Sequence, residues 1–313
     1  MPKKIIITGA AGLVGLNLIS KLNKKDYSIV AIDKNGANLD LIKKINPSVK
    51  VFCADLSQLN PSWMELFKDA NCVIQLQAQI SDSEKGPYIK NNIDSVKNVV
   101  EVCEKLKIKN LIHISSSVVI SIAKDNYSNT KKDGEEIVKK SGVPHTILRP
   151  SLMYGCFDIK HMGFLMKFLR KVPFVYPIPG NGEYIRQPVY VEDLIDIIIR
   201  LIEEKPKNEI WNIIGKEQIY FIDMLKQFAK VEGRNRIFLK IPIPLFLIML
   251  KVYNFLFSEK PFVPAQLNAL IAGDIFPVDS WDEKFHVRYT PFEEGVKKTV
   301  NSELYQYYKI MKK

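Results

Sequence analysis

Short apolar runs alternate with amphipathic segments through the first half of the chain. Continuous apolar runs such as IIIT and SIVAID are typical of strands that are buried on both faces of a sheet. The segments between them place apolar residues at helical spacing, so the pattern predicts a doubly wound parallel α/β (Rossmann) sheet. The predicted strands are 4–8, 28–33, 49–54, 72–76, 110–114 and 145–148, and the predicted helices are 12–22, 38–45, 61–69, 92–106 and 128–140.

After Pro150 the alternation becomes irregular. A Lys-rich helix at 160–171 is followed by a Pro/Gly-rich loop, and the last hundred residues are mostly helical in pattern. A further strand–helix–strand pattern at 187–215 fits the sheet of the first half. We therefore expect a dinucleotide-binding domain at 1–150, joined by 187–215. A smaller, mostly helical and interleaved substrate lobe should comprise 151–186 and 216–313.

Composition places the chain among ordinary globular proteins. Its 313 residues are 47% hydrophobic and 25% charged, which excludes a disordered tail, a collagen-like repeat and a disulfide scaffold. The net charge of +11 comes almost entirely from Lys. A solvated basic surface is one interpretation, and attraction to phosphates or anionic lipid is another. Because contacts to DNA use Arg heavily, we expect no nucleic acid partner.

Cysteine and histidine spacing gives no sign of a metal. The four cysteines and four histidines are dispersed, without the short spacing of a zinc clip or an H-x-x-x-H pair. The first residues lack the apolar core of a signal peptide. These features favour a reduced, cytoplasmic setting and no metal site.

The segment TGAAGLVG at 8–15 carries the strongest motif. It lies directly after one predicted strand and before one predicted helix, with Gly9, Gly12 and Gly15 spaced three apart. Gly9 permits a tight turn, Gly12 lets the backbone approach a pyrophosphate, and Gly15 lets the helix pack close to the sheet. The unpaired N–H groups at the helix N-terminus suit phosphates. The motif therefore predicts dinucleotide binding.

Carboxylates follow the next two predicted strands. Asp33 ends the second strand, 18 residues after Gly15, where it can accept both ribose hydroxyls of adenosine. Its charge would repel a 2′-phosphate, which favours NAD over NADP. Asp55, with Leu56 after it, follows the third strand and either holds the adenine edge or only forms a turn.

Several further motifs resemble one family. The glycine spacing, SSS at 115–117 and YSNTK at 127–131 resemble the short-chain dehydrogenase/reductase superfamily. LRPSLMYG (148–155), RQPVYVEDL (186–194) and YTPFEEGVKKTV (289–300) resemble its extended, NAD-dependent epimerase/dehydratase-like branch. The resemblance implies NAD as cofactor. The cofactor contacts expected are Gly9, Gly12, Leu13, Val14, Gly15, Asp33, Asp55, Leu56, Leu76, Gln77, Ser115, Tyr127, Lys131 and Pro150.

Tyr127 and Lys131 lie at positions i and i+4, on one face of a predicted helix. The Lys131 ammonium can therefore approach the Tyr127 phenol and lower its pKa, so that the phenol exchanges a proton with a substrate hydroxyl or carbonyl. The resemblance implies that a serine holds the same oxygen. It is usually the last of the serine run, which favours Ser117, with Ser116 as the alternative.

Three departures from the family pattern bear on the substrate. Only ten residues separate Ser117 from Tyr127, so the loop over the substrate is short. Val118 and Val119 stand where dehydratases have an acidic pair, which disfavours loss of water. The resemblance also implies substrate contacts at Ser117, Tyr154 and Arg186, with Arg186 gripping a diphosphate. A second phosphate-binding arginine is missing from AGDIFPVDSW (272–281).

The run IPIPLFLIML at 241–250 is uncharged until Lys251 interrupts it. It is shorter than the roughly 20 residues of a membrane span. It fits a buried helix or a dimer face, and Pro242 and Pro244 favour that interpretation. The alternative is an interfacial helix at 241–257, with Arg234, Arg236, Lys240 and Lys251 near lipid head groups.

These observations predict an NAD-dependent oxidoreductase or epimerase that acts on a secondary alcohol or ketone, most simply of a nucleotide-activated sugar. Two alternatives stay open: a non-catalytic NAD-binding scaffold at a membrane or complex, and a reductase of a lipid-like alcohol. We expect a cytoplasmic homodimer with a small-molecule substrate. Peripheral membrane contact through 241–257 is an alternative location.

Overall fold

The structure is a computed structural model that describes residues 2–22, 26–80, 82, 84–122, 125–158, 162–171, 174–256, 267, 270–271 and 273–305. The chain divides into two compact units. The first unit comprises Met1–Pro150, Val191–Ile213 and Asp279–Arg288, and the second comprises Ser151–Tyr190, Ile214–Val278 and Tyr289–Lys313. Asp279–Arg288, which the sequence placed in the substrate lobe, thus groups with the first unit.

The first unit is built on a seven-stranded parallel sheet in the order β11-β6-β5-β4-β1-β2-β3. Its order reverses next to β1, and such a switch point is where doubly wound folds bind their ligands. The predicted Rossmann fold is confirmed. The strands are β1 (Lys3–Thr8), β2 (Tyr27–Asp33), β3 (Lys50–Cys53), β4 (Cys72–Gln75), β5 (Leu111–Ile114), β6 (His145–Pro150) and β11 (Glu209–Ile213).

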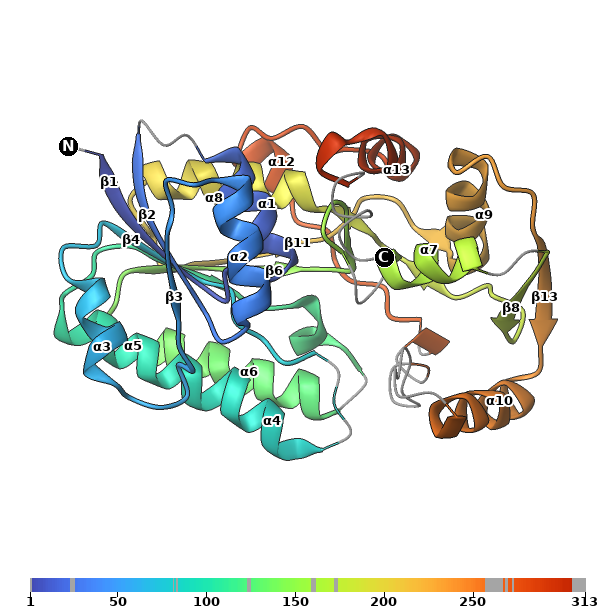
Figure 1. Ribbon diagram of the computed structural model, residues 1–313, viewed down its shortest axis with the longest axis horizontal. Coiled ribbons are helices and arrows are strands. Elements are labelled where there is room, and N and C mark those ends of the chain that lie inside the picture. Colours follow the sequence, from blue (N-terminus) through green and yellow to red (C-terminus); the bar gives the residue numbers. More distant parts are fainter. Residues whose placement is uncertain are drawn as a thin grey trace. The chain divides into compact units, whose positions relative to one another are not determined.

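Helices cover both faces of this sheet (Figure 1). One face carries α1 (Leu13–Lys21), α2 (Gly36–Ile45) and α8 (Val191–Glu203), and the other carries α3 (Pro61–Met64), α4 (Lys85–Ile89), α5 (Ser95–Lys105) and α6 (Asn126–Lys140). Three short irregular helices lie at Glu65–Phe67, Lys90–Asp94 and Ser117–Ile120, the second of them a π-helix. The short helix α12 (Trp281–Lys284) packs against β11.

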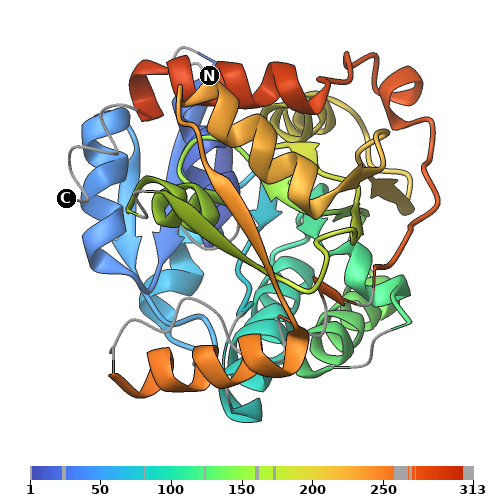
Figure 2. The same ribbon diagram turned by 90° about the vertical axis from the view of Figure 1, so that its right-hand side faces the viewer.

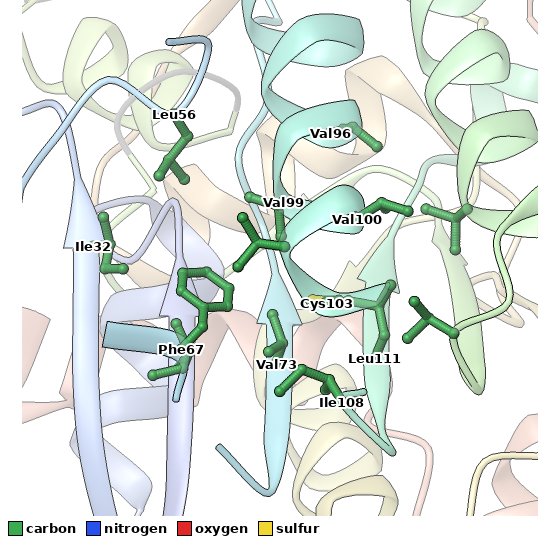
Figure 3. Close-up of a cluster of buried hydrophobic side chains, with 14 of the residues drawn as sticks. Ile32, Leu56, Phe67, Val73, Val96, Val99, Val100, Cys103, Ile108 and Leu111 are labelled. Atoms are coloured by element: carbon green, nitrogen blue, oxygen red, sulfur yellow. The ribbon is translucent and has the colours of Figure 1, made fainter. Parts of the chain in front are cut away.

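Aliphatic side chains of α5 and the strands form the core on one face of the sheet. Val99 and Cys103 of α5 face Val73 of β4 and Leu111 of β5, and all four are fully buried (Figure 3). Burying each such side chain contributes about 1.5–3 kcal/mol, so this core anchors α5 to the sheet.

Within the residues that the structure describes, the second unit combines small strand pairs with helices. β7 (Met153–Tyr154) pairs with β10 (Val189–Tyr190), β9 (Ile185–Arg186) with β12 (Ile219–Tyr220), and β8 (Val175–Pro179) with β13 (Ile237–Ile241). The helices are α7 (Met162–Lys171), α9 (Phe221–Val231), α10 (Ile243–Leu256) and α13 (Phe292–Asn301). Figure 2 shows α10 continuing from the end of β13. Among the described residues, none of the helices is both long and apolar enough to cross a membrane.

Candidate active site

The turn between β1 and α1 requires glycine at two positions. Gly9 has a φ of +67°, and a Cβ there would lie 2.4 Å from the backbone N of Gln77. A Cβ on Gly15 would lie 2.3 Å from the carbonyl O of Ala10, because α1 packs tightly on the turn. Gly12 is the N-cap of α1 and has no side chain to cap it, so the first N–H groups of the helix face no capping side chain.

Asp33 lies directly beside this turn. Its Oδ2 accepts a hydrogen bond from the Ala11 N–H at 3.0 Å, and its Oδ1 accepts one from the Asn35 N–H at 2.9 Å. The structure therefore brings the acidic residue of β2 to the glycine turn. Each carboxylate oxygen keeps a second lone pair with which to accept a ribose hydroxyl.

Gln77, two residues after the end of β4, has a side-chain amide that a ligand bound at the glycine turn could contact. The Thr8 hydroxyl donates to its Oε1 at 2.5 Å, whereas its buried Nε2 has no hydrogen-bond partner among the residues that the structure describes. A buried amide that lacks a partner is costly, and a ligand oxygen would satisfy it. The turn, Asp33 and Gln77 thus fit a dinucleotide at the switch point of the sheet. NAD contacts at these residues, and at Leu76 beside them, stay predictions.

Asp55 and Leu56 are largely occupied by protein contacts. Asp55 accepts hydrogen bonds from Ser57 and forms an ion pair with Lys90 at 2.9 Å. Burial acts to raise the pKa of Asp55, but these donors outweigh it and lower the pKa to about 2. Leu56 is buried in the core. These contacts match the simple turn, and the adenine contact stays a prediction.

Other expected cofactor contacts lie at the same end of the sheet. Leu13 and Val14 begin α1, and Pro150 ends β6. The Ser115 hydroxyl donates to the buried carboxylate of Glu135 at 2.8 Å, so only its remaining lone pairs and backbone are available to a cofactor.

Helix α6 positions the tyrosine and the lysine. Asp125 caps it, accepting a hydrogen bond from the Ser128 N–H at 2.7 Å in a capping box. Tyr127, in the first turn, forms a side-chain hydrogen bond with Ser116. Ser117 begins the short helix Ser117–Ile120, which precedes α6 in the chain, and its side chain is buried. The structure thus brings Ser116, the alternative serine, to the phenol, and a catalytic role of Ser117 stays a prediction.

Lys131 lies one turn further along α6, nine-tenths buried or more, and its Nζ donates to the carbonyl of Ile114 at 2.8 Å. Burial lowers the pKa of Lys131 to about 8, against the opposing effect of Glu135. Burial raises the pKa of Tyr127 to about 12, and the hydrogen bond from Ser116 only partly offsets it. In this arrangement the Lys131 ammonium is bonded to the Ile114 carbonyl, so its expected effect on the pKa of the phenol stays a prediction.

A buried ion pair beneath these residues was not predicted. Arg149 of β6 makes a two-pronged contact with Glu135, through Nε at 3.0 Å and also through Nη2. Glu135 lies four residues after Lys131, so the i, i+4 spacing that singled out Tyr127 and Lys131 continues to it. Breaking such a buried ion pair lowers stability, so the pair helps to hold Ser115 and α6 in place.

Asn92 is a second residue that the sequence analysis missed. It lies in the π-helix at Lys90–Asp94, a distortion that is frequent at functional sites. Its side chain bonds the backbone of Gln79 in both directions, at 2.7 and 3.1 Å, and donates to Thr130 Oγ1 at 3.0 Å. It thereby ties the segment after β4 to α6.

The expected substrate residues of the second unit have protein partners. Tyr154 is 1% exposed, packs on Tyr190 and Phe292, and so belongs to the core of that unit. The expected contact of its side chain with substrate stays a prediction. Arg186 donates to the carbonyls of Ile185 and Leu270, and burial lowers its pKa to about 10.

The glycine turn, the acidic residue that ends β2 and the Ser116, Tyr127 and Lys131 side chains all lie within one stretch of the chain that matches a known family. Residues 5–213 match the profile of the NAD dependent epimerase/dehydratase family. The chain belongs to this family. The predicted resemblance, the enzymatic nature of the protein and NAD as the cofactor of its family are confirmed.

Two members of the NAD-dependent epimerase/dehydratase family with curated names match this chain at low sequence identity. A putative UDP-glucose 4-epimerase of Methanocaldococcus jannaschii is 29% identical over 246 residues, 68% of this chain and 77% of that protein. A trifunctional UDP-glucose 4,6-dehydratase/UDP-4-keto-6-deoxy-D-glucose 3,5-epimerase/UDP-4-keto-L-rhamnose-reductase of Arabidopsis thaliana is 25% identical over 74% of this chain. The match covers only 40% of that longer protein.

Solved structures of the family share the fold over nearly the whole chain. The UDP-glucuronic acid 4-epimerase of Bacillus cereus, in complex with NAD, has a TM-score of 0.69 and 24% identity, covering 99% of this chain and 100% of that one. The UDP-glucose 4-epimerase of Thermotoga maritima, with UDP-glucose, has a TM-score of 0.74 and 20% identity, with coverages of 99% and 100%.

Proposed function

We propose that this protein is an NAD-dependent epimerase of a nucleotide-activated sugar. The observation that carries the proposal is the hydrogen bond between Ser116 and Tyr127, with Lys131 one turn along the same helix, in a chain of this family. The relatives named as UDP-sugar epimerases support the substrate class. Asp33 supports NAD over NADP, because its charge would repel a 2′-phosphate. NAD suits an epimerase, since one carbon is oxidised and then reduced again.

The residues then divide the chemistry as follows. Tyr127 Oη takes the proton of a sugar hydroxyl while the carbon that bears it loses a hydride and becomes a ketone. Ser116 Oγ holds the same oxygen, and the Lys131 ammonium favours the phenolate form of Tyr127 when it turns toward the phenol. NAD, when bound, accepts that hydride and returns it. Return to the opposite face of the ketone, with the proton given back by Tyr127, yields the epimer.

The neighbouring residues favour this reaction over dehydration. Val118 and Val119 directly follow the serine run 115–117. Neither side chain carries an acid that could help to expel a hydroxyl as water. Arg186 is the proposed contact for the diphosphate of the substrate, since its guanidinium can hold two phosphate oxygens. It would have to exchange its bonds to backbone carbonyls for phosphate oxygens on binding.

Product analysis tests the proposal. Purified protein with NAD is incubated separately with UDP-glucose, UDP-glucuronic acid and UDP-N-acetylglucosamine, and the products are separated by chromatography. We expect the epimer of at least one. Tyr127→Phe and Ser116→Ala should lower turnover about 100-fold or more while NAD still binds. The exposed Tyr220 supplies the control, Tyr220→Phe. Full turnover by Tyr127→Phe would disprove the mechanism, and a dehydrated product would disprove the reaction.

Two finer predictions, a homodimer and a membrane contact at 241–257, are proposals as well. Sedimentation analysis of the purified protein would test whether it forms the homodimer. For the membrane contact we commit to an anionic bilayer. Exposed apolar side chains on α10 support it, namely Leu245, Ile248, Val252, Phe255 and Leu256.

A further inference from the structure

The second unit contains an apolar cavity that the proposed epimerase reaction does not use. Its volume is about 160 Å³, and α7, β8, α9 and α10 supply most of its wall. Its lining includes Leu165, Phe168, Tyr176, Phe246, Leu250 and Tyr253.

The lining offers little to a polar ligand. Pro177 and Pro179 of β8 have no backbone N–H, and the Tyr176 hydroxyl already donates to the carbonyl of Leu165 at 3.5 Å. An apolar cavity of about 150 Å³ stays dry and takes a small hydrocarbon such as benzene. This cavity therefore suits a hydrocarbon segment of roughly six carbons, and not a sugar or a nucleotide.

Helix α10 forms one wall of this cavity. Phe246, Leu250 and Tyr253, at helical spacing, line the cavity. On the opposite, outer face of the same helix, Ile248 is 58% exposed and Val252 is 52% exposed. An α-helix that is apolar on nearly all sides suits an environment with hydrocarbon on both sides.

The charges around the cavity favour an anionic amphiphile. The segments 162–186 and 230–256, which supply α7, β8, β13 and α10, hold nine Lys and Arg and two acidic residues. Both acidic residues have cationic partners: Glu232 pairs with Arg170, and Glu183 lies 3.8 Å from Lys240. The excess positive charge attracts anionic head groups to this end of the unit.

We propose that this cavity is a binding site for the hydrocarbon chain of an anionic amphiphile. The chain fills the space between α10 and β8, and the surrounding Lys and Arg residues attract the anionic head. The same chemistry occurs in two sources, a membrane phospholipid and an isoprenoid phosphate. Binding needs neither NAD nor a sugar, so it is measured independently of the epimerase reaction.

Fluorescence titration of the full chain with cis-parinaric acid, an anionic chain, tests the site. Leu250→Trp fills the cavity and should raise the dissociation constant at least 10-fold. The matched control is Ile237→Trp, an exposed position on β13 of the same unit, which should bind as the wild type does. Absence of binding by the wild type would overturn the proposal. Equal binding by Leu250→Trp would do the same, because the chain would then lie elsewhere.

Two further measurements keep the result interpretable. NAD titration and thermal unfolding establish that Leu250→Trp is folded, and Leu165→Phe, on α7, replaces it if it is not. Displacement of the probe by dioctanoyl phosphatidylglycerol or by farnesyl phosphate supports the site, and the stronger competitor identifies the source. Displacement by neither would contradict the proposal.

Discussion

Asp33 holds the glycine turn and also sets the charge beside it. Its two oxygens accept the N–H groups of Ala11 and Asn35, which fixes the carboxylate at the carboxyl end of β2. A 2′-phosphate placed there would meet this negative charge in a partly buried setting. The residue therefore acts on cofactor choice and on the shape of the turn together.

We predict that NAD binds more tightly than NADP, and that Asp33→Ala narrows the difference by weakening NAD and relieving NADP. Calorimetric titration of both cofactors measures it. Asp40→Ala, an exposed carboxylate on α2, is the control and should change neither affinity. Tighter binding of NADP by the wild type would contradict the assignment.

Lys131 makes stability depend on pH. Burial lowers its pKa from 10.5 to about 8, so between these values the unfolded chain binds a proton that the folded chain does not. Stability therefore rises with pH in this interval. Relative to Lys131→Met, the wild type should gain about 3 kcal/mol in free energy of unfolding between pH 7 and 10.5.

Urea unfolding at the two pH values measures this gain. The exposed Lys132 supplies the control, because Lys132→Met should follow the wild type. A constant difference between the wild type and Lys131→Met would show that the ammonium is not buried in the folded protein.

At this scale the sequence predicted residue types better than contacts. The spacing of Tyr127 and Lys131 placed both on one helix face, as the structure has them. It could not say which serine hydroxyl reaches the phenol, since that depends on how the chain turns after β5. Nor could it show where the ammonium points, or that Arg149 crosses from β6 to Glu135.

At the scale of elements, α10 shows why an apolar run is ambiguous. Residues 241–250 fit a buried helix or an interfacial one, and the structure gives the helix one face on a cavity and one in solvent. Periodicity cannot separate these faces, because both are apolar. The π-helix at Lys90–Asp94 could not be predicted from the sequence either. One extra residue in a turn leaves the amphipathic pattern of 92–106 almost unchanged.

We predict that the wild type floats with phosphatidylglycerol liposomes and that salt weakens this binding, because Lys and Arg supply part of it. Ile248→Ser combined with Phe255→Ser, 58% and 89% exposed, should abolish flotation with little change in stability. Leu59→Ser, 50% exposed in the first unit, is the control. Flotation that survives the double change would exclude α10 as the contact.

For the whole molecule, the main feature is that each unit is assembled from separate stretches of chain. The sequence predicted that residues 1–150 and the strand–helix–strand segment 187–215 belong to one domain, because both stretches carry a strong apolar period. Asp279–Arg288 carries no such period over its ten residues. Its place in the first unit depends on tertiary contacts, such as the Asn212 N–H donating to Asp279 Oδ2 at 2.8 Å.

We predict that Trp281→Ala destabilises the first unit although the residue lies near the end of the chain. Trp281 is fully buried, and removing such a side chain costs about 3–5 kcal/mol. NAD affinity measured after mild heating, with urea unfolding, should reveal the loss. Ile275→Ala, 53% exposed and outside this segment, should behave as the wild type. Equal stability of the two variants would show that α12 is dispensable.

The late arrival of this segment also matters during synthesis. The ribosome completes β11 at Ile213 but must add roughly 75 more residues before Arg288 emerges, which takes about 4–15 s at 5–20 residues per second. During that interval Trp211 lacks Phe285, the ring that packs on it at 5.5 Å. The edge strand β11 is then uncovered on that side. Premature pairing with another nascent chain would therefore begin at this edge.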